Sequence, residues 1–547
     1  MLKEHLPFEI QWKILDYLET ESKIQYSLVS KHWREAARYV LFRSICLESV
    51  EEEDAFIDLL IESPSLGEST KSLMLKSNSS MERDQQYSAL IRLTPNLRFL
   101  QIDCDAGPFY QVALLEIQRG HWKYLHHIKD ISNTTSISSM GANDIANSSL
   151  GYHALLSATK DRLSDVVLDL SSVSHSPTEI HCFQYPLYIT RQTRFRSVKH
   201  LTFVSSHKTA IKSLDDALAL FPNATDVILR HVELESHEDK LAEIEPNTVV
   251  EGLFITISAL PKESLNYISC KFPNVKQLVL RAVENLESLT DFMRYAYSVK
   301  RLNMQLWRQE GLMVLLDAIV PLQWQGKMEI KFNPKILGLQ YNRSEARHSK
   351  LYVRNHIGSF DFARASLIAY LNQLDELDTY SIDPEHIQLL SHCTQLKTLR
   401  ICHNNVSVSE IPVLPITCFI SSGGSNNMSF LEHLSASAPN LRDAMIEFNS
   451  SNITEICMPS TSFHSLCINF IEPLPTDLLD VHLIRSGEET YYQSLENQLC
   501  EIGPSEYRHE GSSISKVRIE IMCKDIKYLE LRWQPNDFKY QCILHEF

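Results

Sequence analysis

One short frame of apolar residues recurs at regular intervals along most of this chain, and it limits the possible folds more than any other feature. The frame is an apolar residue, two residues, an apolar or small residue, one residue, an apolar residue. Its middle positions include Leu201, Val227, Leu253, Leu278 and Leu302, which are separated by steps of 26, 26, 25 and 24 in residue number. Four frames follow a Pro-Asn pair, at Pro95-Asn96, Pro222-Asn223, Pro273-Asn274 and Pro439-Asn440. A fixed period of this length predicts a repeat architecture.

One repeat can be interpreted in physical terms. A helix is expected to start at Ser213, and Leu214, Ala217 and Leu218 fall on one helical face. Pro222 ends the helix, and the asparagine after it turns the chain into a strand whose apolar residues point inward at every second position. A single unit of this kind cannot bury its apolar face alone, so consecutive units must stack.

The period lies in the leucine-rich range, and Leu396-x-x-Leu399-x-Ile401-x-x-Asn404 matches the leucine-rich frame. The predicted fold class is therefore α/β: a leucine-rich-repeat solenoid with parallel strands on the concave face and helices outside. A doubly wound α/β sheet is the alternative. Its βαβ units are longer than these steps, and only 15 glycines occur in the chain, none in a glycine-rich turn after a strand.

Residues 1–48 have a different pattern and predict three short helices. Ile10, Ile14 and Leu18 form one apolar stripe, Ser22 and Gln25 form a capping box for a second helix, and Trp33 belongs to a third. So short a segment cannot bury a core of its own. It has more large apolar side chains than three small helices can cover, which is typical either of a docking domain or of a cap on a larger domain.

The order of these residues closely resembles the F-box: Leu-Pro, then Ile-x-x-x-Ile-Leu-x-x-Leu, then Leu-Val-x-Lys-x-Trp. Family members bind a Skp-type adaptor, which ties them to the cullin scaffold of a ubiquitin ligase. The resemblance implies an adaptor-binding surface built from Leu6, Pro7, Ile10, Ile14, Leu15, Leu18, Leu28, Val29 and Trp33.

The predicted organisation is an F-box-like adaptor-binding domain over 1–48 and a leucine-rich-repeat solenoid over 49–547. The domain over 1–48, called the head below, is expected to pack against the first repeat near Leu73 and Leu75, at a fixed angle. Some stretches are too long or too polar for one repeat and are predicted to be loops or insertions; they lie near 131–152, 333–362, 421–430 and 484–515.

Composition excludes several classes of function. No run of 18 apolar residues is present, so no membrane span is expected. The net charge of −16 disfavours nonspecific binding to nucleic acid or to an anionic membrane, so neither is expected as a partner. The 12 cysteines never form Cys-x-x-Cys and are interpreted as small apolar residues in a reducing compartment, so a cytoplasmic or nuclear location is expected.

No catalytic or metal-binding motif was found, so neither enzymatic activity nor a cofactor is expected. His126-His127 and His392-Cys393 are expected at helix or loop positions and have no partner at metal spacing. Residues between the apolar frame positions should point into the concave surface, where their mixture of charge, arginine and aromatic groups suits protein recognition. The candidate target-binding residues are Arg230, Arg281, Arg301, Arg400, Tyr528 and Arg532.

The sequence therefore favours a non-catalytic substrate-recognition subunit of a Skp–cullin–F-box ubiquitin ligase. Its partners would be the adaptor, through it cullin, and an unknown target protein. One alternative is an interaction scaffold that builds no ligase. The other is an enzyme or a small-ligand receptor with its site in an insertion such as 333–362, which would need a deep pocket lined by polar groups.

Overall fold

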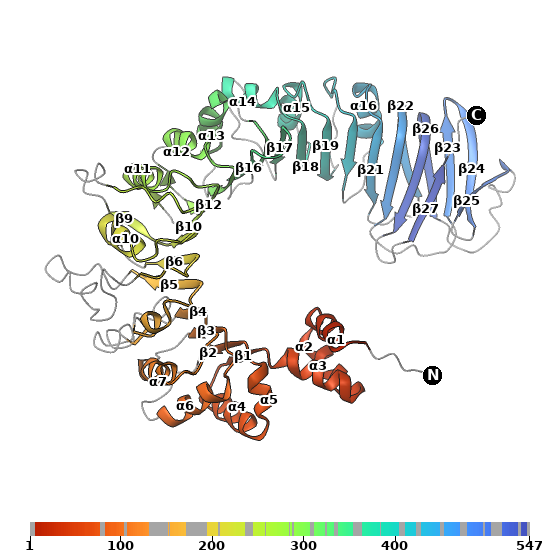
Figure 1. Cartoon of the computed structure of the whole chain (residues 1–547). Coiled ribbons are helices and arrows are strands. Elements are labelled where there is room, and N and C mark those ends of the chain that lie inside the picture. The colour runs from red at the N-terminus through yellow and green to blue at the C-terminus, as the bar shows by residue number, and fades with distance from the viewer. Residues whose placement is uncertain are drawn as a thin grey trace. The chain divides into compact units, whose positions relative to one another are not determined.

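The structure is a computed structural model, and it divides the chain into two compact units, residues 1–287 and 288–547. Each unit mixes helices with strands that are mostly parallel (Figure 1). Among the described residues, no helix is both long and apolar enough to span a membrane. The described residues are 6–76, 83–102, 107–130, 151–152, 154–170, 194–205, 208–235, 244–256, 259–283, 285–286, 289–306, 311–322, 325–332, 337–353, 364–382, 384–403, 411–422, 428–448, 453–470, 479–495, 498–504, 517–533 and 538–543.

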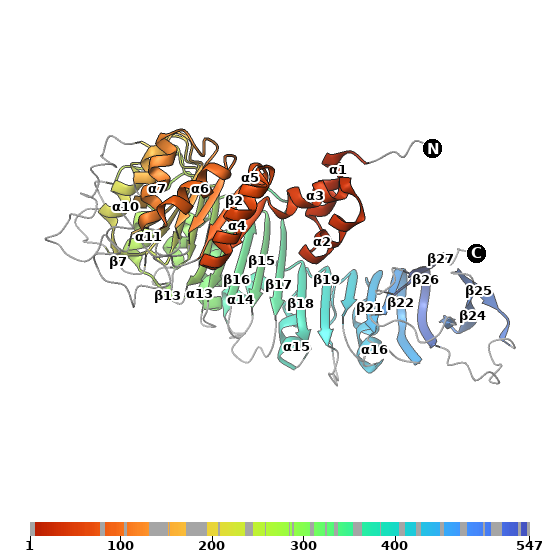
Figure 2. The same ribbon diagram turned by 90° about the horizontal axis from the view of Figure 1, so that it is seen from below.

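The first unit begins with helices α1 (Phe8–Asp16), α2 (Thr20–Val29) and α3 (Lys31–Leu41), which lie together as one group (Figure 2). The Ser30 side chain accepts a hydrogen bond from the backbone N–H of Trp33 at 3.3 Å, which caps α3. The expected start of the second helix at Ser22 is wrong. Helix α2 begins two residues earlier, and its N-cap residue Glu19 makes no side-chain cap hydrogen bond, so no capping box sets its start.

The head has a small core of its own between α1 and α3. Leu15, Ala36, Ala37 and Val40 are buried there. Four larger side chains pack against them and remain partly exposed: Trp12, Leu18, Trp33 and Tyr39. The small residues of α3 let the two helices approach closely, and the indole and phenol rings close the sides.

A short junction joins the head to the first strand, β1 (Ser44–Leu47). The Phe42 ring stacks on Phe56 of helix α4 (Val50–Glu62), with centroids 6.5 Å apart. The Arg43 carbonyl accepts the backbone N–H groups of Lys71 and Ser72 at 2.9 and 3.0 Å. Strand β1 then pairs with strand β2 (Ser72–Leu75), next to the leucines where the head was expected to pack. The head is therefore held on the first strand pair without a flexible linker.

The rest of the first unit repeats a strand and a helix. Its main strands pair in parallel, in register from one to the next: β1, β2, β3 (Phe99–Ile102), β4 (His127–Asp130), β5 (Asp165–Asp169), β6 (His200–Val204), β8 (Asp226–Arg230), β10 (Gly252–Thr256) and β12 (Gln277–Val283). The helices lie on one side of these strands (Figure 1): α4, α5 (Pro64–Ser69), α6 (Asp84–Leu93), α7 (Gly107–Gln118), α10 (Ile211–Leu218) and α11 (Lys262–Lys271). Small pairs at the strand exits are β7 (Lys208–Ala210) with β9 (Glu233–Glu235) and β11 (Ala259–Leu260) with β13 (Asn285–Leu286).

The frame found in the sequence sets the register of this sheet. Leu201 pairs with Val227, Val227 with Leu253, and Leu253 with Leu278, so the predicted middle positions lie side by side. All four are buried against the helices. Each fully buried aliphatic side chain contributes about 1.5–3 kcal/mol to stability, so the row fixes the pairing. The opposite face of the strands carries no helix among the described residues and is called the open face below.

The asparagines of the Pro-Asn pairs link each repeat to the one before it. Their amide groups donate to backbone carbonyls of the preceding repeat: Asn96 to Glu68 at 2.8 Å, Asn223 to Arg196 at 2.8 Å, and Asn274 to Thr248 at 3.2 Å. The sequence analysis explained the turn but did not predict this contact. Asparagine recurs because its side chain can satisfy a carbonyl that no strand neighbour reaches.

A buried carboxylate joins α6 to α7. Glu116 is 1% exposed and accepts hydrogen bonds from Ser88 at 2.9 Å, Arg92 at 2.9 and 3.0 Å, and Arg119 at 2.6 Å. The bond from Arg92 is the largest cause, and it lowers the pKa of Glu116 to about 2 against the opposing effect of burial.

The second unit also alternates helices and strands, and its first departure from the parallel order lies at strand β16 (Leu337–Asn342). This strand runs antiparallel to both β14 (Arg301–Leu306) and β15 (Lys327–Phe332), and β17 (His348–Val353) returns in parallel on the far side of β15. Residues 337–353 therefore form two strands where the sequence suggested a loop or insertion. The apolar residues Leu337, Leu339 and Tyr341 alternate along β16 and are buried. The residues between them are not apolar, and they obscured this strand pattern in the sequence.

The remaining elements of the second unit up to its last described helix are α12 (Leu289–Ala296), α13 (Gly311–Ile319), η3 (Val320–Leu322), α14 (Ala365–Leu371), β18 (Glu376–Ser381), α15 (Pro384–Ser391), β19 (Thr398–His403), β20 (Cys418–Ser421), α16 (Met428–Ser437) and β21 (Asp443–Phe448). Strands β17 to β21 pair in parallel, each with the next. The insertion expected near 131–152 lies outside the described residues except for 151–152. Residues 423–427 of the insertion expected near 421–430 also lie outside them, and so does Asn404 of the leucine-rich frame.

The end of the second unit is built from strands alone in its described part (Figure 1). Two long strands, β22 (Ile453–Phe470) and β26 (Val517–Trp533), pair in parallel. Residues 463–468 and 526–531 each fit the apolar frame, and their middle positions Leu466 and Leu529 lie opposite each other. Strands β23 (Leu479–Arg485), β24 (Glu488–Leu495) and β25 (Gln498–Ile502) form a meander beside β26. Strands β24 and β25 lie within the stretch near 484–515 that was expected to be a loop or insertion. Strand β27 (Phe538–Ile543) closes antiparallel on β26.

Candidate functional site

The head exposes a large part of its apolar surface. Leu28 and Val29, at the end of α2, are 75% and 66% exposed, and Tyr17, just after α1, is 92% exposed. Ile10 and Ile14 lie one turn apart on α1 and are also exposed. Protein surfaces carry single apolar residues routinely, but so many on so small a domain make it a candidate interaction site.

The nine head residues singled out in the sequence divide between this surface and the core. Leu15 is fully buried, and Leu18 and Trp33 pack against the core as partly exposed side chains. The other six are exposed: Leu6, Pro7, Ile10, Ile14, Leu28 and Val29. Leu15 therefore supports the helices from inside, whereas these six are placed where a partner could cover them.

Four further exposed apolar residues belong to the same small domain but were not selected from the sequence: Phe8, Tyr17, Ile24 and Tyr26. Ile24 lies one helical turn before Leu28, a spacing that could have indicated it. The Tyr26 and Trp33 rings lie 5.2 Å apart and join α2 to α3 at the surface.

A groove with a volume of about 880 Å³ runs across the open face of the first unit. It crosses strands β3 to β10. Its lining residues are Phe99, His127, Lys129, Asp165, Val166, Val167, His200, Thr202, Val204, Asp226, Ile228, Arg230, His231 and Phe254. Because the strands are in register, most of these side chains fall into three rows that run perpendicular to the strands.

The first row lies where the strands begin and alternates histidine with aspartate. His127, Asp165, His200 and Asp226 occupy paired positions on four successive strands. His127 Nδ1 lies 3.7 Å from Asp165 Oδ2, and His200 Nδ1 lies 3.1 Å from Asp226 Oδ2. The sequence placed His127 on a helix or loop; it begins β4 instead, because strand pairing with Phe99 and Asp165 extends to this residue.

Two local features shape this row. Burial raises the pKa of Asp165, but hydrogen bonds from His127 and Ser164 outweigh it and lower the pKa overall, so the carboxylate is charged at neutral pH. Position 252 follows Asp226 in the row and is glycine. A Cβ there would overlap Asp226 Oδ1, so the glycine leaves room for this carboxylate to extend over the sheet.

The middle and third rows differ from the first in character. The middle row is mainly apolar, with Val167, Thr202, Ile228 and Phe254 at paired positions. The third row lies near the strand exits, where Arg230 and Arg281 flank Thr256 on neighbouring strands. The structure therefore brings together two of the arginines predicted from the sequence, about 10 Å apart across one strand.

The N-terminal segment matches a known family. An F-box-like family profile covers residues 3–48. The chain begins with an F-box-like domain. Among solved structures, one described as the complex of Rad7 and Elc1 in yeast is similar over 75% of this chain and 90% of that chain, at 15% identity and a TM-score of 0.31. No curated protein matches the chain.

The remaining candidate residues belong to the second unit. Arg400 lies 3.6 Å from the Asp378 carboxylate, and Arg532 lies 2.5 Å from Glu530. Arg301 is exposed at the start of β14, and Tyr528 is half-buried between Ser465 and Ile543. The structure does not bring these four together, and two of them already have carboxylate partners within the chain.

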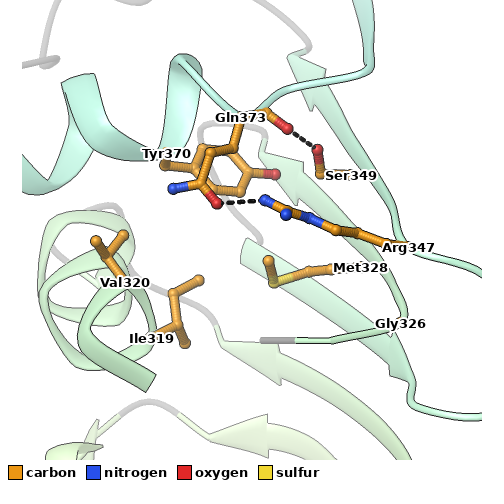
Figure 3. Close-up of a pocket in the computed structure, with 8 residues that line it drawn as sticks. All are labelled: Ile319, Val320, Gly326, Met328, Arg347, Ser349, Tyr370 and Gln373. Atoms are coloured by element: carbon orange, nitrogen blue, oxygen red, sulfur yellow. Dashed lines mark hydrogen bonds between the residues drawn. The ribbon is translucent and has the colours of Figure 1, made fainter. Parts of the chain in front are cut away.

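A second, much smaller cavity lies in the second unit beside the stretch 337–353 (Figure 3). Its volume is about 40 Å³, whereas small-molecule sites have about 300–1,000 Å³. Arg347 donates to Gln373 Oε1 at 2.6 Å, and Ile319 and Met328 form part of the apolar wall. This cavity has room for one or two waters.

Reactive groups are scarce in the described part of the chain. No cluster of three or more metal-ligating side chains occurs among the described residues. Burial raises the pKa of Cys393 and Cys523 to about 12, so these thiols stay protonated and unreactive at neutral pH. The histidines and aspartates of the first row form two separate pairs, His127 with Asp165 and His200 with Asp226, rather than a cluster around one point.

Proposed function

We propose that this protein is the substrate-recognition subunit of a Skp–cullin–F-box ubiquitin ligase. The observation that carries the proposal is the F-box-like match over residues 3–48 together with the exposed apolar residues of that domain. A partner that covered Leu28, Val29 and Ile10 would bury surface that the isolated chain leaves in water. Each such side chain would contribute about 1.5–3 kcal/mol before the costs of association.

We further propose that the strand and helix units form a leucine-rich-repeat solenoid whose strands carry the target-binding surface. The regular steps between frames and the paired frame positions support this. The chain would do no bond chemistry. It would hold the target, while the adaptor and cullin bring the ubiquitin-charged enzyme.

The junction between head and repeats supports the same role. Phe42 stacked on Phe56, and the Arg43 carbonyl bonded to two backbone N–H groups, hold the F-box-like domain on the first strand pair. A ligase gains from such rigidity, because the target must be presented to the transferring enzyme at a set position.

The test is reconstitution of the full chain with a Skp-type adaptor, cullin and the ubiquitin-transfer enzymes. The proposal predicts that cullin co-purifies with the chain only when the adaptor is present, and that ubiquitin is transferred to proteins retained by the chain. Binding of the adaptor without cullin would identify an interaction scaffold instead. Failure to bind any Skp-type adaptor would overturn the proposal.

A further inference from the structure

The groove of the first unit has opposite charges on its two sides and an apolar row between them. The first row contributes the carboxylates of Asp165 and Asp226. The third row contributes the guanidinium group of Arg230 from the groove lining and continues to Arg281 on β12, just beyond that lining. Along a strand, residues i and i+2 are about 6.6 Å apart. The first and third rows are four residues apart along each strand, so they are separated by about 13 Å. A ligand in this groove meets negative charge, apolar surface and positive charge in that order.

The carboxylates of the first row keep part of their bonding capacity free. In both histidine contacts it is the Oδ2 atom of the aspartate that faces the histidine. The hydroxyl groups of Ser164 and Thr225 also donate to Oδ2, of Asp165 and Asp226 respectively. The Oδ1 atoms make no hydrogen bond or ion pair with any described residue, and that of Asp226 lies over Gly252 on the open face. A carboxylate oxygen in this state can accept a hydrogen bond from a cationic side chain.

The arginines of the third row are equally available. Arg230 and Arg281 are exposed and form no ion pair with the described residues, unlike Arg400 and Arg532 in the second unit. Arginine binds carboxylate and phosphate groups through paired donors. In a chain with a net charge of −16, two such arginines beside an apolar row favour an anionic group on the ligand.

The spacing of the rows matches an extended peptide. In an extended chain, alternate side chains point to the same side and lie about 6.6 Å apart, which is the distance between neighbouring rows. A peptide running along the strand direction can therefore place three alternate side chains on the three rows. The middle one would contact Ile228 and Phe254, two apolar residues at paired positions of the middle row.

We propose that this groove is the target-binding site and that it takes an extended segment with basic, apolar and acidic side chains at alternate positions. The basic group binds the Oδ1 atoms of Asp165 and Asp226, the apolar group packs on Ile228 and Phe254, and the anionic group binds Arg230 and Arg281. The inference rests on the proposed function, since it names the class of target which that function leaves open.

The test starts with selection of random dodecapeptides displayed on phage, using the full chain as bait. Enriched peptides are then synthesised with a fluorescent label, and their affinity is measured by fluorescence anisotropy. Three forms of the best peptide are compared: the acidic residue as selected, as its amide, and as phosphoserine. The protein variants are Arg230→Gln with Arg281→Gln, and Arg196→Gln as a control at an exposed arginine outside the groove lining.

We expect enriched peptides to carry a basic and an acidic residue four positions apart with an apolar residue between. The amide peptide should bind the parent at least tenfold more weakly, and the double variant should bind the acidic and amide forms equally. Tighter binding of phosphoserine would identify the anion as phosphate rather than carboxylate. Peptides without this pattern, no enrichment, or unchanged discrimination in the double variant would overturn the inference.

Adaptor binding is measured on the same preparations, and it separates the two proposals. If the double variant no longer distinguishes the acidic peptide from the amide peptide but still binds the adaptor, the change affects the groove alone. An absence of adaptor binding in the parent, with the peptide pattern intact, overturns the ligase proposal and leaves the groove as a peptide-binding site. A variant Gly252→Ala adds a further check, because its Cβ displaces Asp226 Oδ1 and should weaken the preference for the basic residue. The Cβ also meets the Phe254 ring at 3.3 Å, so the contact with the apolar residue should weaken as well.

Discussion

Single asparagines hold successive repeats together in the first unit. Asn96, Asn223 and Asn274 each donate to a carbonyl of the repeat before, at 2.8 to 3.2 Å. The sequence showed that these residues recur but did not predict their contact. A Pro-Asn pair is already explained by the turn that it forms, so the pattern gave no sign of a hydrogen bond to another repeat. Only the stacking of repeats brings a carbonyl of the preceding repeat within reach.

Replacement of these asparagines by alanine should lower stability in equal steps. Each lost hydrogen bond costs about 1 kcal/mol, and the three sites are on separate repeats, so the triple variant should lose about 3 kcal/mol. Urea unfolding of the first unit, compared between the parent and the single and triple variants, measures this loss of stability. A triple variant as stable as the parent would mean that solvent replaces these contacts without loss.

The Glu116 carboxylate should make stability depend on pH in the acid range. Its pKa is about 2 in the folded protein against an ordinary value of 4.5, so its stabilising effect is complete above pH 4.5 and is lost as pH falls toward 2. Glu116→Gln should therefore destabilise the protein by about 1.5–3 kcal/mol at pH 7, and this difference should shrink between pH 4.5 and 2. Urea unfolding of both proteins across this range tests the claim; a difference independent of pH contradicts it.

At the scale of elements, the head helices combine a minimal core with a large exposed apolar surface. The sequence predicted three helices, and the third buries Ala36, Ala37 and Val40, whose spacing places them on one helical face. The sequence could not say which large apolar residues turn inward. Leu15 and Ile14 are neighbours in the sequence with equal hydrophobic character, yet Leu15 is buried and Ile14 is exposed.

This difference predicts opposite effects of two similar substitutions. Leu15→Ala should destabilise the head by about 2–5 kcal/mol, because it leaves a cavity between α1 and α3. Ile14→Ala should change stability by less than about 1 kcal/mol, because Ile14 already faces solvent. Hydrogen exchange over residues 8–41 should accelerate only in the first variant. Equal acceleration in both would place Ile14 in the core.

Strand register was the element-level feature that could be predicted best. Leu201, Val227, Leu253 and Leu278 were singled out by spacing, and they lie paired on neighbouring strands. Helix starts were less accurate: α10 begins at Ile211 rather than Ser213, and α2 begins at Thr20 rather than Ser22. Burial imposes a strict pattern on strand interiors, whereas a helix end can move by a turn at little cost.

At the scale of the whole molecule, the sequence predicted one continuous array after the head, and the structure divides the chain at residues 287 and 288. The antiparallel strand β16 and the meander of β23 to β25 were not predicted as strands. Their pairing partners are set by neighbours in space, and the repeat frame does not include them. The groove was predictable only in part, since spacing indicated Arg230 and Arg281 but not the histidine and aspartate row beside them.

The rigid junction leads to a prediction about the ligase as a whole. A flexible Gly-Ser-Gly-Ser insertion between Phe42 and Arg43 should leave adaptor affinity unchanged, because the exposed head residues are untouched. Ubiquitin transfer to a bound target should fall several-fold, since the target is no longer held at a set position. The reconstituted reaction measures both, and unchanged transfer would show that the junction geometry is unimportant.

The most direct test of the central claim is the affinity of the full chain for a Skp-type adaptor, measured by titration calorimetry. We predict that the parent binds and that Leu28→Glu with Val29→Glu weakens binding at least a hundredfold, because two apolar contacts of about 1.5–3 kcal/mol each are lost. Leu115→Glu, at a leucine of α7 that is 53% exposed, is the matched control and should bind like the parent. Equal binding by the double variant, or no binding by the parent, would contradict the claim that this domain is an adaptor-binding F-box.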